Sequence, residues 1–171
     1  RQMKPASEKT LAEGIKVITV PDIRWKRRDI KSTSLLPNCL AKQQAYEAGA
    51  AEAWLVDDDG TVTEGSSTNA WIVTAAGELV TRAPTNAILS GITRRAVVDI
   101  AAEEGLRLVE RPFTPAEAKS AREVFITSTT AFVMPVTQID DAVIANGKSG
   151  SISRKLRARY AAHMAAAGAA G

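Results

Sequence analysis

Short apolar runs separated by turn residues dominate the first half of the chain. The segment IKVITV at 15–20 is rich in β-branched residues and predicts a strand that stops at Pro21. Two later segments, AEAWLVDDDGTVTEG at 51–65 and NAWIVTAAGELVTR at 69–82, each place a glycine-containing turn between two apolar runs. This arrangement is typical of hairpins, so the pattern predicts a meandering antiparallel set of strands.

Helical periodicity and further strands fill the rest of the sequence. Helix formers predict a helix from about Pro37 to Ala48, and apolar residues recur at helical spacing from Ile92 until Gly105 ends that helix. The remaining predicted elements are a strand at 106–111, a short helix at 115–121, two strands within 123–140 and an amphipathic helix at 151–164. Because strands and helices mix without strict alternation, we predict an α+β fold rather than a doubly wound parallel sheet.

The composition is that of one ordinary globular domain. The 171 residues can bury a substantial core, and the net charge is only +3, with 22 basic and 19 acidic residues. So mild a charge, with few aromatic residues, argues against a dedicated nucleic-acid binder. The single cysteine, Cys39, fits a reducing compartment, so we expect a cytoplasmic protein. No apolar run is long enough to predict a membrane span.

One segment is unusually basic. DIRWKRRDIKSTSLL at 22–36 contains five cations close together, namely Arg24, Lys26, Arg27, Arg28 and Lys31. Such a cluster can form a surface for a polyanion, a solvated face, or the surroundings of a lysine that does chemistry. The segment alone leaves these three interpretations open.

Residue types exclude several kinds of catalytic chemistry. His163 is the only histidine, which excludes Ser-His-Asp and Cys-His hydrolases and histidine-rich metal centres. The sequence also lacks the glycine-rich phosphate-loop and dinucleotide-binding motifs. We therefore predict no metal site, and the chemistry that remains requires a lysine, a carboxylate and donors for a phosphate.

Two clusters could supply phosphate donors, SGIT at 90–93 and TSTT at 127–130. Gly91 lets the backbone approach a ligand closely, and the amides of Ile92 and Thr93 open a helix whose dipole favours an anion. Serine and threonine are also ordinary helix caps and turn formers, so each cluster alone has a purely structural explanation. Glu64, in VTEGSSTN, follows a strand; a carboxylate there could face a pyridine nitrogen and favour its protonated form, or simply lie beside a turn.

Taken in order, four motifs resemble the fold-type IV pyridoxal-phosphate aminotransferases. Within that group their residues are most similar to those of the bacterial D-amino acid aminotransferases. The motifs are DIKSTSLLPNCLAKQQAYEAG, EAWLVDDDGTVTEGSSTNAW, ILSGITR and VFITSTTAFVMPVTQID. The resemblance implies the C-terminal cofactor domain of that fold, with mixed and antiparallel strands forming a barrel-like core between flanking helices. We expect residues 1–13 to be a linker from a preceding domain, 14–164 the large pyridoxal-phosphate-binding domain, and 165–171 an Ala/Gly-rich tail.

The resemblance also implies a role for individual residues. Lys31 matches the catalytic lysine that forms a Schiff base with the cofactor, Glu64 the carboxylate that bonds its pyridine nitrogen, and Leu89 the residue that packs on its ring. The residues expected around the phosphate are Gly91, Ile92, Thr93, Ser128 and Thr129. The expected neighbours of this site are Ser67 at the cofactor, with Arg24, Ser66 and Thr68 in support. Lys26, Arg27 and Arg28 are then left as a solvated face.

The function that the resemblance implies is ping-pong transfer of an amino group from a D-amino acid, such as D-alanine, to a 2-oxo acid. A homodimer with small-molecule substrates is expected, without nucleic-acid or membrane partners. Alternatives within the fold type are a branched-chain L-amino acid aminotransferase, an R-selective amine transaminase and aminodeoxychorismate lyase. A basic nucleic-acid-binding module is the alternative outside it. The chain departs from the family pattern at Thr33-Ser34, where relatives more often have leucine and asparagine.

Overall fold

One curled sheet carries the fold, which the computed structural model describes over residues 6–169. The strands are β1 (Ile15–Pro21), β2 (Glu52–Val56), β3 (Val62–Gly65), β4 (Asn69–Val73), β5 (Leu79–Thr81), β6 (Leu108–Glu110), β7 (Glu123–Ser128), β8 (Phe132–Ile139) and β9 (Ala142–Val143). The helices are α1 (Glu8–Glu13), α2 (Leu36–Glu47), α3 (Ile92–Glu103), α4 (Pro115–Lys119) and α5 (Ser151–Ala169). The strands of this described range pair in the order β3-β2-β1-β8-β7-β4-β5-β6, and β9 pairs with β8.

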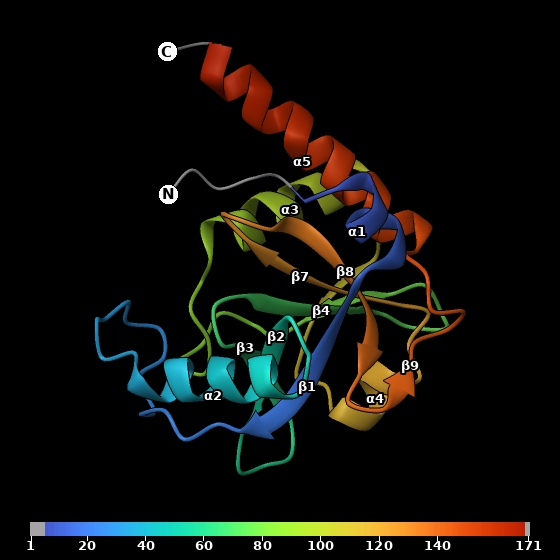
Figure 1. Ribbon diagram of the computed structural model, residues 1–171. Coiled ribbons are helices and arrows are strands. Elements are labelled where there is room, and N and C mark those ends of the chain that lie inside the picture. The colour runs from blue at the N-terminus through green and yellow to red at the C-terminus, as the bar shows by residue number, and fades with distance from the viewer. Residues whose placement is uncertain (1–5, 170–171) are drawn as a thin grey trace.

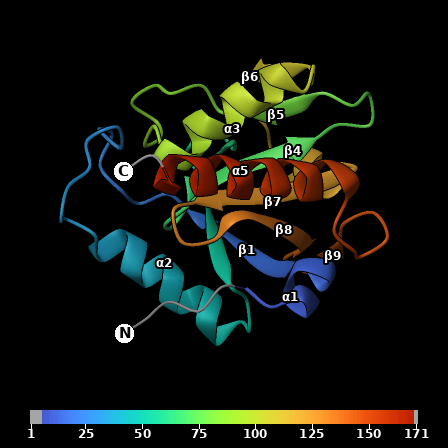
Figure 2. The same cartoon turned by 90° about the horizontal axis from the view of Figure 1, so that it is seen from above.

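Helices cover the sheet on separate sides. Helix α2 packs against β1 and β2, whereas α3 and α5 pack against each other and against β7 (Figure 1). Seen from above, α5 runs along β7 and β8 with α3 beside it (Figure 2). Strand β3, at one end of the sheet, contacts β4, which gives the sheet its half-barrel form. The predicted α+β fold with a barrel-like core is confirmed.

The central strand β4 is buried on both faces. On one face Ile72 belongs to a core cluster with Trp54 and Phe113, and on the other Trp71 stacks on Phe125 beneath α3 and α5. Large aromatic side chains contribute much of the apolar area that a core removes from water. Strands buried on both faces have continuous apolar sequences. This explains why the apolar and polar positions of β4 do not alternate.

The predicted meander is wrong, although both of its hairpins form. Strands β2 and β3 pair antiparallel, as do β4 and β5. Between these two hairpins the sheet inserts β1, β8 and β7, and β1 runs parallel to both β2 and β8. A turn motif determines only the pairing of the two strands that it joins. The order of the hairpins in the sheet depends instead on pairing between strands that are distant in the sequence.

Helices occupy both ends of the described chain. Helix α1 lies inside the segment expected to be a linker, and Ser7 caps it by accepting a hydrogen bond from the Thr10 amide at 3.1 Å. Helix α5 continues past the predicted end at Met164 to Ala169, because alanine has the highest helix propensity. Residues 1–5 of the expected linker and 170–171 of the expected tail lie outside the described residues. In the described range, no helix has the length and apolarity needed to cross a membrane.

Candidate active site

The Glu64 carboxylate lies at the end of β3, buried and surrounded by donors. The Arg24 Nη1 donates to Oε1 at 2.6 Å, and the Leu89 amide and Asn69 Nδ2 donate to Oε2 at 3.1 Å each. Burial raises the pKa of Glu64 to about 7, while the charge of Arg24 opposes that rise. The carboxylate is therefore fixed in position, and its ionisation depends on Arg24.

Arg24 is itself held by a second carboxylate. Its Nε and Nη2 donate to the two oxygens of Asp22, at 2.9 and 2.8 Å, and the Thr63 hydroxyl donates to Asp22 at 2.8 Å. Burial opposes ionisation of Asp22, but the hydrogen bonds and charge of Arg24 prevail and lower its pKa. Arg24 thus lies between the carboxylates of Asp22 and Glu64 and contacts both.

Lys31 lies in the loop between β1 and α2 and is exposed. Among the described residues its ammonium forms no ion pair, and no hydrogen bond joins it to Glu64 or to the predicted phosphate residues. The loop that carries Lys31 is joined to the segment before α3, because the Arg28 amide donates to the Asn86 carbonyl at 3.0 Å. The amine of Lys31 is therefore accessible, and it does not contact any other predicted site residue of the described range.

The assignment of Arg28 to a solvated face is wrong. Arg28 is buried, its Nη1 donates to Asp57 at 2.8 Å, and its Nε lies 3.1 Å from Asp22. Lys26 and Arg27 are exposed, as predicted, and both also pair with aspartates. Since carboxylates neutralise four of the five cations in the basic segment, it is poorly suited to bind a polyanion.

A buried glutamate that the sequence analysis missed holds the turn after Glu64. The Ser66 hydroxyl donates to Glu52, and the Ser67 hydroxyl donates to the same carboxylate at 3.0 Å. Glu52 is 1% exposed, at the start of β2. The Thr68 hydroxyl is buried without a hydrogen-bond partner in the described chain. The predicted neighbours Ser66, Ser67 and Thr68 therefore form a turn that Glu52 stabilises through two hydrogen bonds. The Thr68 hydroxyl is the one buried polar side-chain group of this turn left unsatisfied in the described residues.

The predicted phosphate turn at Gly91 is a helix start without a side-chain cap. Gly91 is the N-cap of α3, and its φ of −62° is available to any residue. A side chain there would instead displace Asn69, because its Cβ would lie 2.3 Å from Asn69 Oδ1. The first backbone amides of a helix have no acceptor within the helix, and together with the helix dipole they suit an anion.

Asn69 contacts the Glu64 carboxylate, lies close to both predicted phosphate clusters, and was also missed by the sequence analysis. Besides Glu64, its Nδ2 donates to the Leu89 carbonyl at 2.9 Å, two residues before Gly91. In the β4–β7 pairing Asn69 lies opposite Thr127, the first residue of TSTT. The SGIT and TSTT clusters therefore lie at the same end of the sheet as Glu64.

The remaining predicted phosphate residues differ in exposure. Thr93 is 2% exposed and its hydroxyl lies 3.2 Å from that of Tyr160, whereas the Ile92 side chain is 62% exposed. The Ser128 hydroxyl accepts a hydrogen bond from the Ala131 amide at 3.0 Å, and Thr129 is exposed. These donors suit a phosphate, and the buried Glu64 suits a basic ring nitrogen, so the residues present fit pyridoxal phosphate.

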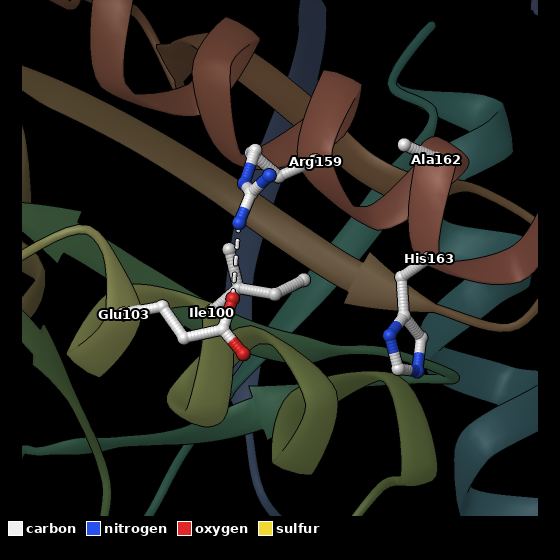
Figure 3. Close-up of a pocket in the computed structure, with 5 residues that line it drawn as sticks. All are labelled: Ile100, Glu103, Arg159, Ala162 and His163. Carbon is white, nitrogen blue, oxygen red and sulfur yellow. Dashed lines mark hydrogen bonds and ion pairs between the residues drawn. The ribbon is translucent and has the colours of Figure 1, made fainter. Parts of the chain in front are cut away.

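A cavity of about 240 Å³ lies between α3 and α5, away from these residues (Figure 3). Its lining consists of Ile100, Glu103, Arg159, Ala162 and His163. Arg159 and Glu103 form an ion pair of 3.0 Å across it. None of the predicted site residues lines this cavity, so it is not the candidate active site.

Comparison with known proteins defines the family. The family model described as amino-transferase class IV matches residues 1–139, and the chain belongs to this family. The chain is 45% identical to the D-alanine aminotransferase of Bacillus licheniformis, over 88% of this chain and 52% of the relative. It is 46% identical to that of Staphylococcus epidermidis strain RP62A, over 86% of this chain and 51% of the relative. The predicted resemblance is confirmed, and the chain spans about half the length of the curated relatives it matches.

Solved structures agree on the fold. The branched-chain amino acid aminotransferase of Thermobaculum terrenum, in its PLP-form, superposes with a TM-score of 0.79 at 27% identity, over 91% of this chain and 52% of the other. The branched-chain aminotransferase of Thermoproteus uzoniensis with norvaline gives a TM-score of 0.77 at 32% identity, over 86% and 50%. The described domain therefore has the fold of the corresponding half of these enzymes.

Proposed function

We propose that the protein to which this chain belongs is a pyridoxal-phosphate-dependent aminotransferase that transfers an amino group from a D-amino acid, such as D-alanine, to a 2-oxo acid. Relatives 45 and 46% identical to this chain are D-alanine aminotransferases, which supports the D-amino acid. The observation that carries the proposal is the contact of Asn69 with both the Glu64 carboxylate and the Leu89 carbonyl. It brings a buried acid and an uncapped helix start into one site.

The cofactor would be held at its two ends by different elements. Glu64 would accept a hydrogen bond from the ring nitrogen, and Leu89 would pack against the ring. The amides of Ile92 and Thr93, with the hydroxyls of Thr93 and Thr129, would bind the phosphate. When bound, pyridoxal phosphate supplies a carbonyl that condenses with amines and a ring that withdraws electrons from the substrate α-carbon.

Lys31 would supply the amine that holds the cofactor and would then move the proton at the substrate α-carbon. A lysine must be uncharged to accept that proton, and it returns the proton as a general acid. Its exposed position between β1 and α2 leaves the amine accessible. We therefore propose Lys31 as the catalytic residue.

Arg24 would keep Glu64 in the form that this chemistry requires. A charged carboxylate stabilises a protonated ring nitrogen, which is the better electron acceptor. Burial alone favours the neutral acid, and the Arg24 guanidinium at 2.6 Å favours the carboxylate. The pair therefore makes the charge of Glu64 available at neutral pH.

A second amino donor, the site of the substrate carboxylate and the quaternary structure complete the proposal. The branched-chain aminotransferases among the solved structures make a branched-chain L-amino acid the second candidate donor. The residues that bind the substrate carboxylate are expected in the part of the relatives that this chain does not cover. We also propose a cytoplasmic homodimer, from the single cysteine and from the family resemblance.

Incubation of the full-length protein with pyridoxal phosphate tests the cofactor proposal. We expect visible absorption, and borohydride reduction should attach a pyridoxyl group to the peptide that contains Lys31. The Lys31→Ala variant should stay colourless, whereas the control Lys26→Ala, at an exposed lysine paired with Asp57, should behave as wild type. A colourless wild type, or colour retained by Lys31→Ala, would contradict the proposal.

A donor screen tests the substrate class. D-alanine and D-glutamate are compared with L-alanine and branched-chain L-amino acids, and the chirality of the product is determined. Turnover of D-alanine with formation of a D-amino acid supports the proposal, and turnover confined to branched-chain L-amino acids favours the second candidate.

A further inference from the structure

We infer that Arg157 and Tyr160 of α5 are positioning residues that hold the two phosphate-binding turns, and that they thereby set the affinity for the phosphate group. The inference rests on the proposed function, since it assumes that these turns bind a phosphate. It concerns two residues that the sequence analysis did not assign. Both lie on one helix, three positions apart, and therefore on one face.

Tyr160 reaches the first turn. Its hydroxyl lies 3.2 Å from that of Thr93, and the two residues are 4% and 2% exposed. Each hydroxyl has one proton to donate, and a phosphate oxygen only accepts. If Tyr160 donates to Thr93, the proton of Thr93 is left for the phosphate. The buried phenol thus orients the threonine as a donor.

Arg157 reaches the second turn. Its Nη1 donates to the carbonyls of Ala131 and Val133, at 2.7 Å each, and these residues lie two and four positions after Thr129. In the described chain no carboxylate lies within ion-pair distance of Arg157, so its contacts are with this turn. The turn needs such support, because Phe132 has a φ of 60°, which is unfavourable for a residue other than glycine.

Phe132 connects the two contacts. The Arg157 guanidinium lies 5.6 Å from its ring centroid, and the Tyr160 ring packs edge-on at 5.3 Å. One helix face therefore touches the Thr93 turn and the 128–132 turn together. Substitutions here should weaken the binding of the phosphate without changing the contacts at Glu64, where the ring nitrogen is expected.

Comparing pyridoxal phosphate with pyridoxal, which lacks the phosphate, tests this inference in the full-length protein. Tyr160→Phe and Arg157→Met should each weaken pyridoxal phosphate binding by about fivefold or more, the effect of one lost hydrogen bond, and should leave pyridoxal binding unchanged. Tyr160→Phe should also shift the ³¹P resonance of the bound phosphate. Matched controls are Tyr46→Phe, at a tyrosine 79% exposed, and Arg154→Met, at an exposed arginine of the same helix.

The possible outcomes separate the inference from the proposed function. Equal loss of both ligands would reveal a merely structural role and overturn the inference, as would no loss of either. Wild-type protein that binds no pyridoxal phosphate would overturn the proposed function and the inference together. If Arg157→Met does not fold, Tyr160→Phe decides alone, since it removes a single buried oxygen atom.

Discussion

Arg24 and Glu64 form a buried ion pair, with Nη1 and Oε1 2.6 Å apart and side chains only 9% and 6% exposed. The pair joins the loop that carries Lys31 to the end of β3, across 40 positions of sequence. Burial and pairing act in opposite directions on the same carboxylate. The protonation of Glu64 therefore depends on the balance between its burial, which raises the pKa, and the Arg24 guanidinium, which lowers it.

Removal of Arg24 should destabilise the protein and raise the pKa of Glu64 further. Breaking a buried pair by removing one partner costs about 3–5 kcal/mol, and here the buried Asp22 carboxylate loses the same guanidinium as Glu64. Urea unfolding of Arg24→Met should give a loss of that order, and pyridoxal phosphate binding should weaken. The control Arg27→Ala breaks an exposed pair with Asp29 and should change stability by less than about 1 kcal/mol. An equal effect in both variants would contradict the role of Arg24.

The raised pKa of Glu64 predicts a pH dependence of stability in the cofactor-free protein. Between its ordinary value and about 7, the folded state retains a proton that the unfolded state has released. The contribution of Glu64 to stability therefore falls as the pH rises through this interval. Glu64→Gln removes the titration, so wild type should lose stability relative to the variant from about pH 5 to pH 7. Urea unfolding of both proteins measures the difference, and a difference independent of pH would refute the raised pKa.

Asp57 should show the opposite dependence. Hydrogen bonds from Arg28, stronger than the effect of partial burial, hold its pKa below the ordinary range. Such a group stabilises the folded state above its unfolded pKa, and this contribution is lost as the pH falls through the lower folded value. Asp57→Asn should cost about 1.5–3 kcal/mol at pH 7, with a difference that shrinks below about pH 4.

Asp58 supplies the matched control for Asp57. It lies in the same turn, but its side chain is 88% exposed, and within residues 6–169 it pairs only with Lys26. Asp58→Asn should leave the unfolding midpoint in urea nearly unchanged, both at pH 7 and below about pH 4. A loss as large as that of Asp57→Asn would mean that general charge in the turn, rather than the buried contact with Arg28, stabilises the protein.

The sequence predicted those features that short motifs encode. The positions of Glu64 at the end of β3 and of Gly91 at the start of α3 follow from turn and helix signals a few residues long. The family resemblance added the role that is proposed for Lys31. These local signals also predicted both hairpins, but not their separation in the sheet, since that depends on contacts between distant strands.

The residues that were missed act through distant contacts. Arg28 is buried because it pairs with Asp57, 29 positions away, and nothing in its own segment distinguishes it from Arg27. Asn69 contacts the Leu89 carbonyl across 20 positions. A signal did exist for Glu52, an acidic residue at the start of a strand that is otherwise apolar. A polar residue in such a run must find a buried partner.

Gly91→Ala should disrupt the site at its centre. The φ of Gly91 permits alanine, so a change in backbone propensity is not the cause. The added Cβ would lie 2.3 Å from Asn69 Oδ1 and would displace the side chain that contacts Glu64 and Leu89. We expect stability to fall by about 1–3 kcal/mol, as in overpacked sites, and pyridoxal phosphate binding to weaken. The adjacent Ser90→Ala, at an exposed position, should leave stability unchanged.

A double variant distinguishes this clash from a general effect on α3. Asn69→Ala removes the atoms that the new methyl group would meet, so its destabilisation and that of Gly91→Ala should not add. Urea unfolding of the two single variants and the double variant measures the coupling, which should be at least about 0.5 kcal/mol in favour of the double variant. Strictly additive losses would show that Gly91 is required for a reason other than its close approach to Asn69. Binding of pyridoxal phosphate should stay weak in the double variant, because the contact that joins the carboxylate to the helix start is then missing altogether.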